Sequence, residues 1–245
     1  MKNKSKRLIN NTIIFFIGSL GSKFIQFFLV PLYTYVLTTE QYGVTEIVLT
    51  ASNVLMPVFS LSIADGLLRF GLDKNWKKED VLKTSLVIVF IGTICSILFI
   101  PVFASYDGLK HWMSYFLLIL NFRIYRDVFA INLKINDKNL YFAIDSIIYT
   151  FALCGFSVLF LTILKMGIKG YFLSYVVANI VSIINLIIVG KPLRDLTNGK
   201  IHKSLLYDLI IYSIPMIANG IAWWVITASD RFILQYYEGA SSVGI

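Results

Sequence analysis

The sequence predicts an all-α protein that crosses a membrane several times. The composition supports this prediction, because 57% of the 245 residues are hydrophobic, 15% are charged, and the mean hydropathy is +0.74. A soluble domain carries more charge and fewer apolar residues. The apolar residues also form long runs, and a helix of about 20 residues spans the roughly 30 Å of a bilayer's hydrocarbon core.

Seven apolar runs of about 20 to 27 residues have the length of a membrane span. They cover residues 11–36, 44–70, 81–103, 112–133, 140–164, 168–189 and 205–228. Pro31, Pro57 and Pro215 fall within three of them. Such prolines kink a transmembrane helix while its neighbours satisfy the freed backbone groups. We therefore expect one helix from each run, three of them kinked.

Basic residues gather at alternate gaps between these runs. They lie before the first run, after the second, around the end of the fourth and after the sixth. The other gaps hold only Lys110, Lys165 and Lys169, with Arg231 beyond the seventh run. Basic residues are retained on the cytoplasmic side, so the pattern predicts a cytoplasmic N-terminus. The net charge of +8 follows this sidedness and does not indicate a nucleic-acid partner.

The gap after the sixth run divides the sequence. Residues 1–190 hold six runs, residues 191–203 form a basic linker with Lys-Pro and Asn-Gly pairs, and residues 204–245 begin a further unit. The first and seventh runs both start on the predicted cytoplasmic side and both lead into an acidic, glycine-containing turn, as in a parallel repeat. We expect a six-helix N-terminal lobe and the first helix of a second, pseudo-symmetric lobe, which is incomplete here.

The sequence lacks the motifs of the common enzyme classes. It has no Walker-type phosphate loop, no His/Cys metal spacing and no serine elbow, and its short connections leave no roomy site for paired carboxylates. Cys95 and Cys154 fall within apolar runs and are interpreted as packing residues. His111 and His202 lie in polar turns, where we expect solvated side chains. No catalytic residue, cofactor or metal is expected.

Ionisable side chains at membrane depth are candidates for function, because burying them is costly unless they are paired or face water. Lys23 lies about 22 Å along the first helical segment, and Gln26 follows one turn later near the same face. Lys23 faces either a cavity or a structural partner. Asp65 and Arg69, spaced i, i+4, form either an interfacial ion pair or a ligand site in which Asp65 carries a coupling proton.

Two arginines share a helix face in the fourth run. They are Arg123 and Arg126, with Asp127 adjacent in sequence. The short turn that follows brings Asp145 of the fifth run to a similar depth. Guanidinium groups bind phosphate oxygens bidentately, which suits a diphosphate arriving from the inner leaflet. The alternative is a positive-inside anchor that the two aspartates neutralise.

Four segments carry more specific patterns. The first run closes on Pro31-Leu32-Tyr33 before Glu40-Gln41-Tyr42-Gly43, and the second ends in Asp65-Gly66-Leu67-Leu68-Arg69-Phe70. A loop with Lys191 and Arg194 follows the sixth run. The seventh run carries Ser213-Ile214-Pro215, Asn219 and Trp223-Trp224, and leads into Ser229-Asp230-Arg231-Phe232. With these patterns the sequence resembles, over essentially its whole length, the polysaccharide flippases of the multidrug/oligosaccharidyl-lipid/polysaccharide exporter superfamily.

The resemblance implies a two-lobed transporter in the cytoplasmic membrane of a bacterium or archaeon. Its substrate would be an isoprenoid-diphosphate-linked oligosaccharide, moved by alternating access for a surface polysaccharide such as O-antigen or capsule. It also implies coupling to a proton or sodium gradient. Other polysaccharide assembly proteins would be its protein partners. Lys23 and one of Arg123 or Arg126 are predicted to contact the diphosphate. The other candidate substrate-binding residues are Gln26, Asp65, Arg69, Asp145, and the pair Asp230 and Arg231, which ends the seventh run on the predicted outer side.

Three other functions stay open. A drug or cation exporter of the same superfamily would favour carboxylates over Lys23 in its cavity. A membrane polysaccharide polymerase or ligase would be expected to carry a long outside loop with reactive side chains, whereas the outside gaps here are short. The third alternative is an inactive truncated fragment.

Overall fold

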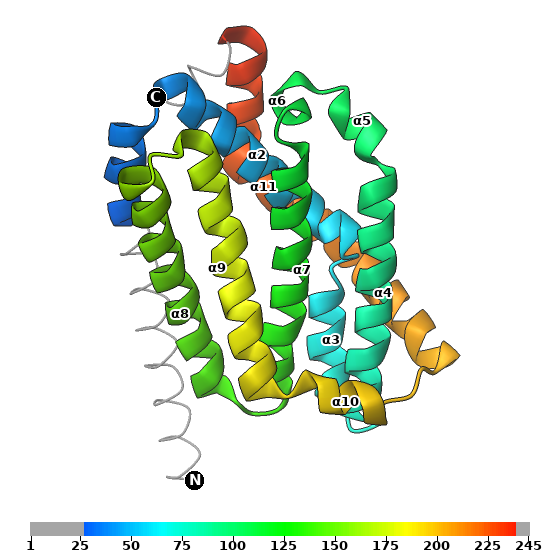
Figure 1. Ribbon diagram of the computed structural model, residues 1–245. Helices are drawn as coiled ribbons and strands as arrows, with labels where there is room; N and C mark the ends of the chain where they lie inside the picture. The colour runs from blue at the N-terminus through cyan, green and yellow to red at the C-terminus, as the bar shows by residue number, and fades with distance from the viewer. Residues whose placement is uncertain (1–26, 239–245) are drawn as a thin grey trace.

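The computed structural model describes residues 27–238, and every regular element in that range is a helix (Figure 1). The helical segment Phe27–Val36 precedes α2 (Thr39–Phe59), α3 (Ile63–Gly71), α4 (Lys78–Leu98), α5 (Ile100–Ala104), α6 (Asp107–Lys110) and α7 (Met113–Ile135). There follow α8 (Asn139–Val158), the π-helical turn η1 (Leu159–Ile163), α9 (Gly167–Gly190), α10 (Pro192–Asn198) and α11 (Lys203–Glu238).

Five helices in the described range are long and apolar enough to cross a membrane. They are Thr39–Phe59, Lys78–Leu98, Asn139–Ile163, Gly167–Gly190 and Lys203–Ala222. The outward face of α4 carries large exposed apolar side chains such as Phe90, Ile94 and Leu98. A patch of this kind is unusual on a soluble protein and suits contact with lipid. The prediction of an all-α polytopic membrane protein is confirmed.

Helix α7 covers the predicted run 112–133 but is not one of these five helices. Arg123, Arg126 and Asp127 interrupt its apolar sequence. The helix lies in the middle of the bundle, with α8 and α9 on one side and α3 and α4 on the other (Figure 1). Its apolar face, which includes Phe116 and Ile124, is fully buried in the core. Neighbouring helices rather than lipid therefore surround much of α7.

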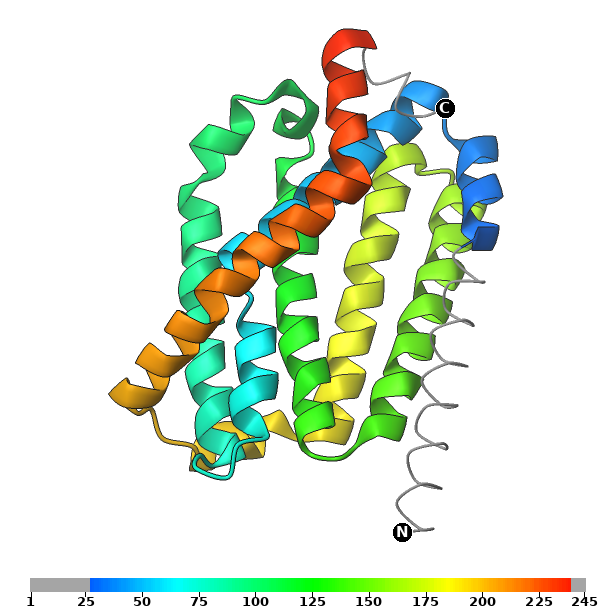
Figure 2. The same cartoon turned by 180° about the vertical axis from the view of Figure 1, so that it is seen from behind.

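Helices α2 and α11 run obliquely to the others. Figure 2 shows α11 crossing the bundle, and α2 packs against both α11 and α7. At their crossing, a Cβ added to Gly220 of α11 would lie 3.0 Å from the Cβ of Pro57, so the two backbones approach closely there. Helix α11 continues through Pro215 to Glu238, well beyond the predicted end of the seventh run at residue 228.

The second predicted run, 44–70, does not form a single kinked helix, so that expectation was wrong. Helix α2 ends at Phe59 and α3 begins at Ile63. Between them, Leu61 and Ser62 adopt left-handed backbone conformations with φ of 51° and 49°. The amide of Ser62 donates to the carbonyl of Pro57 at 2.9 Å, which closes the end of α2 as in a helix C-cap. The chain therefore breaks the helix instead of bending it.

The connection between α9 and α11 is fixed to the start of α4. Asp80 accepts a hydrogen bond from the backbone amide of Lys200 at 2.6 Å, and its other oxygen lies 3.2 Å from Nε2 of His202. The ammonium of Lys83 donates to the carbonyl of Gly199 at 2.9 Å. The His202 side chain is 41% exposed, as expected for a residue in a polar turn, and Asp80 contacts its ring from the buried side.

Candidate functional site

A polar cavity lies among α2, α7, α8 and α9. Its volume is about 400 Å³, and we call it the arginine cavity. It is lined by Leu49 and Asn53 of α2, Arg123 and Arg126 of α7, Ser146, Tyr149, Thr150 and Leu153 of α8, and Tyr175 of α9. A smaller cavity of about 250 Å³ shares both arginines and adds Asp127 and Asp145. The two arginines thus line a polar space inside the helical bundle.

The sequence of α7 directs these arginines away from the core. Arg123 and Arg126 are three residues apart and lie on one face of the helix. Ile124 and Val128 are fully buried and occupy the opposite face. Because the apolar residues bind α7 to its neighbours, the helix cannot rotate without exposing them, and the arginines keep their orientation toward the cavity.

Arg126 is held on three sides. Its Nε donates to the hydroxyl of Ser182 at 2.7 Å, and its Nη2 lies 3.5 Å from Oδ2 of Asp145. Its guanidinium carbon lies 3.9 Å from the centre of the Tyr149 ring, a cation–π contact. The side chain remains 21% exposed, on the side that faces the arginine cavity. Arg126 is therefore positioned by the protein while part of its guanidinium stays accessible.

Asp145 is a buried carboxylate with three partners. Its side chain is 1% exposed. Oδ2 accepts a hydrogen bond from Ser182 at 2.7 Å, and Oδ1 accepts one from the Asn185 amide at 2.9 Å. Burial of a charge without partners is strongly unfavourable, and here two donors and one nearby cation offset that penalty. Ser182 links the two charges, because it accepts from Arg126 and donates to Asp145.

Arg123 has a different environment. It is exposed toward the cavity and donates from Nη1 to the side-chain oxygen of Asn53, which connects α7 to α2. Among the side chains that the structure describes, no carboxylate oxygen lies within 4.0 Å of its guanidinium. Its contact in the cavity is therefore with a neutral amide.

Asp65 and Arg69 line a separate cavity. This third space, about 380 Å³, lies between α3 and α11 and also includes Asp73, Tyr212 and Met216. The guanidinium of Arg69 lies 5.8 Å from the ring centre of Tyr212. Within the described part of the chain, the structure shows no ion pair between Asp65 and Arg69. Of the predicted site residues, it brings Arg123, Arg126 and Asp145 together, but not these two.

The remaining predicted residues cannot be placed in the site. Lys23 and Gln26 lie outside the described residues. Asp230 and Arg231 belong to the helical backbone of α11, and their side chains are also outside what is described. Helix α11 extends past this pair to Glu238.

Several neutral polar residues were not predicted from the sequence. On α9, Tyr175 lines the arginine cavity while Ser182 and Asn185 bind the buried charges. With Asn179 they recur at intervals of four, three and three residues, which places them along one face of the helix. That polar stripe in a very apolar helix is the signal that would have found them. Asn53 has no comparable pattern around it.

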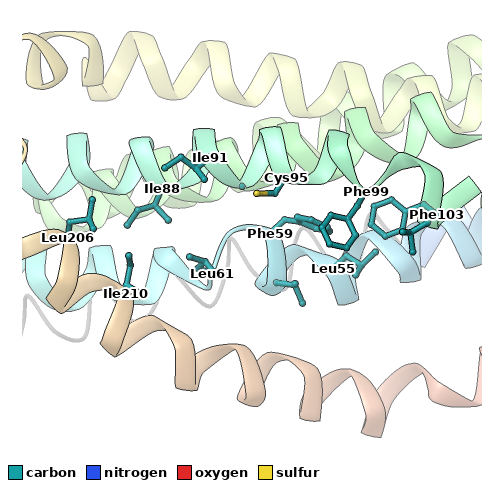
Figure 3. Close-up of a pocket in the computed structure, with 13 residues that line it drawn as sticks. Leu55, Phe59, Leu61, Ile88, Ile91, Cys95, Phe99, Phe103, Leu206 and Ile210 are labelled. Carbon is teal, nitrogen blue, oxygen red and sulfur yellow. The ribbon is translucent and has the colours of Figure 1, made fainter.

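An apolar cavity of about 510 Å³ lies on another side of α2 (Figure 3). Leu55 and Phe59 of α2, Ile88 and Ile91 of α4, and residues of α5 and α11 line it. Figure 3 shows its lining extending along α4, from Leu206 and Ile210 at one end to Phe99 and Phe103 at the other. Its apolar walls, spread along α4, suit a hydrocarbon chain more than a polar ligand.

Comparison with protein families gives one result that covers most of the chain. Residues 8–245 match a family described as "Polysaccharide biosynthesis protein". Comparison with curated proteins and with solved structures finds no match. The family match agrees with the resemblance to flippase-type exporters and with a bundle of membrane-spanning helices. Because the match covers far more than half of the sequence, the chain belongs to the polysaccharide biosynthesis protein family.

Proposed function

We propose that this protein is a flippase, or the N-terminal lobe of one, for an isoprenoid-diphosphate-linked oligosaccharide. It moves this lipid across the cytoplasmic membrane by alternating access, coupled to a proton or sodium gradient. Family membership supports a role in polysaccharide biosynthesis, and the five long apolar helices support a place in the bilayer. The single observation that carries the proposal is the pair of arginines on the wall of a polar cavity within the bundle.

The arginine cavity suits a diphosphate. Guanidinium groups form bidentate hydrogen bonds with phosphate oxygens, and these are stronger than hydrogen bonds between neutral groups. Electrostatic attraction is larger inside the bundle than in water, because the surrounding dielectric is lower. Arg123 and Arg126 therefore offset the loss of hydration when the headgroup leaves water. Asn53, Thr150 and Tyr175 add neutral polar groups that can bind sugar hydroxyls.

The apolar cavity suits part of the isoprenoid chain. Ile91, Phe99 and Val102 line it and are at least half exposed on the outer surface, so the cavity opens toward the bilayer. Helix α2 separates the two spaces, with Asn53 on the arginine cavity and Leu55 on the apolar one. A lipid-linked substrate has the same division into a charged, hydroxylated head and a hydrocarbon tail.

The test measures surface polysaccharide in cells whose own gene for this protein is deleted. Arg126→Ala, expressed from the whole gene, should reduce export at least about tenfold, because removal of one close charge contact costs more than 1.4 kcal/mol. Arg126→Lys should retain part of the activity. The matched control is Arg194→Ala, which removes an exposed arginine on α10. Export by Arg126→Ala at the level of the control, with equal protein in the membrane, would rule out the proposal.

A second readout separates drug export from flipping. Cells that carry the Arg126→Ala variant are tested for resistance to cationic dyes and for surface polysaccharide in parallel. Loss of polysaccharide with unchanged dye resistance supports the flippase. Loss of dye resistance alone would instead identify a cation exporter.

A further inference from the structure

We propose that Asp145 is an internal competitor of the substrate's diphosphate for Arg126, and so sets how tightly the headgroup binds. The inference rests on the proposed function, because it concerns the same arginine. It assigns Asp145 a positioning and affinity-setting role, with no direct contact to the substrate. Three features of the structure lead to it.

The first feature is the looseness of the ion pair. The separation of 3.5 Å between Nη2 of Arg126 and Oδ2 of Asp145 exceeds the roughly 2.7–2.9 Å of a charge-assisted hydrogen bond. The pair therefore gains from electrostatic attraction without close directional contact. Nε of Arg126 binds Ser182 instead. The Nη groups keep hydrogen atoms that an anion in the cavity can accept while Nε keeps its partner.

The second feature is that Asp145 does not depend on Arg126 for hydrogen bonds. Both carboxylate oxygens accept from neutral donors of α9, Ser182 and Asn185. When Arg126 engages another anion, Asp145 keeps both of these bonds and loses only electrostatic compensation. The exchange of one anion for another at Arg126 is therefore possible without rebuilding the site.

The third feature is the balance of charge around Asp145. Arg126 is its ion-pair partner on α7, and Arg123 and Asp127 of the same helix line the smaller cavity with it. Tyr149 of α8 packs on Arg126, and the groups that reach Asp145 from α9 are neutral. In the empty site, Asp145 offsets the cost of an arginine at membrane depth. Its negative charge also weakens the attraction of Arg126 for a second anion.

The consequence is an affinity that depends on the charge of Asp145. The carboxylate of Asp145 shares Arg126 with a bound diphosphate and repels that diphosphate. A neutral side chain of the same shape, such as asparagine, would leave the full charge of Arg126 to the diphosphate and should strengthen its binding.

The test measures binding of inorganic pyrophosphate to the full chain in lipid nanodiscs by calorimetry. Asp145→Asn should bind pyrophosphate at least about tenfold tighter than the wild type at pH 7.5, which is the size of one close charge interaction. Asp208→Asn, a carboxylate of α11 outside this cavity, is the control and should match the wild type.

Failures of the two proposals are distinguishable. If Arg126→Ala binds pyrophosphate as well as the wild type does, the diphosphate site and the proposed function fail. If Arg126→Ala weakens binding but Asp145→Asn binds equally or more weakly at pH 7.5, the competitor role of Asp145 is wrong and the site remains.

A second variant covers the case in which Asp145→Asn does not fold. Asp145→Ala also removes the negative charge, so it should bind pyrophosphate more tightly than the wild type at pH 7.5. Equal or weaker binding by a folded Asp145→Ala would overturn the role of Asp145.

Discussion

Gly92 of α4 lies directly against the carbonyl oxygen of Phe59, at the residue where α2 ends. A Cβ at position 92 would overlap that oxygen, so no larger residue fits without moving one of the two backbones. The contact holds α4 against the break between α2 and α3, and both residues line the apolar cavity.

Gly92→Ala should therefore destabilise the protein by about 1–3 kcal/mol, the usual result of overpacking a core. The matched control is Gly155→Ala in α8, where an added Cβ meets no atom within 4 Å. There the change should be neutral or stabilising, because glycine is a poor helix former. Thermal unfolding of the detergent-solubilised protein measures both. Equal midpoints for the two variants would show that the Gly92 contact carries no such constraint.

Removal of one buried hydroxyl should weaken the attachment of the first described helix. The Tyr33 hydroxyl lies 3.0 Å from that of Ser157 in α8, and Ser157 donates to Ser174 of α9 at 3.1 Å. Tyr33→Phe should cost about 0.5–1.5 kcal/mol, the net value of a typical hydrogen bond. Tyr35→Phe, at a side chain that is 90% exposed, is the control. The prediction is contradicted if both variants unfold at the wild-type temperature.

Asp195 of α10 should make stability depend on pH. Burial and the nearby carboxylate of Glu79 raise the pKa of Asp195 above its ordinary value of 3.8. The folded state thus holds the proton more tightly than the unfolded state, so stability falls as pH rises through the raised pKa. Asp195→Asn should be more stable than the wild type at pH 7, with the difference vanishing below pH 3.8. Unfolding midpoints across this range test it, and a variant that is less stable at pH 7 would refute it.

Lys23 remains a prediction from the sequence. In the complete transporter, Lys23→Ala should block export of surface polysaccharide, because it removes a cation from the proposed headgroup path. Lys23→Arg should retain part of the export, since the charge persists. Lys169→Ala, at an exposed lysine of α9, serves as the control. Normal export by Lys23→Ala at normal protein level would end this assignment.

The sequence predicted those features that depend on local pattern. The apolar runs correspond to α4, α8 and α9 within a few residues, because length and hydropathy decide which segments enter a bilayer. The break after Phe59 was missed, since Leu61 and Ser62 carry no turn signature and the break coincides with a tertiary contact to Gly92.

The site shows the same difference between features set by local sequence and features set by long-range packing. Arg123, Arg126 and Asp145 could be singled out from the sequence because charged residues stand out in apolar helices, and the short connection between α7 and α8 keeps them near each other. Asn53 and Ser182 were missed because neutral polar residues are common in such helices. Their importance depends on which helices pack together, and α2 and α9 are distant in sequence from α7. The separation of Arg69 from the arginine cavity follows from the same long-range packing.

The charges of α7 should affect how this helix inserts into the membrane during synthesis. Arg126 emerges from the ribosome before Asp145 and Ser182 do, so these partners are not yet available to it. A helix with this charge content is a poor candidate for insertion alone. We expect α7 to enter the bilayer stably only together with α8 and α9. A truncated chain that ends before Asn139, once released from the ribosome, should leave α7 accessible to water-soluble reagents, whereas one that extends through residue 190 should protect it.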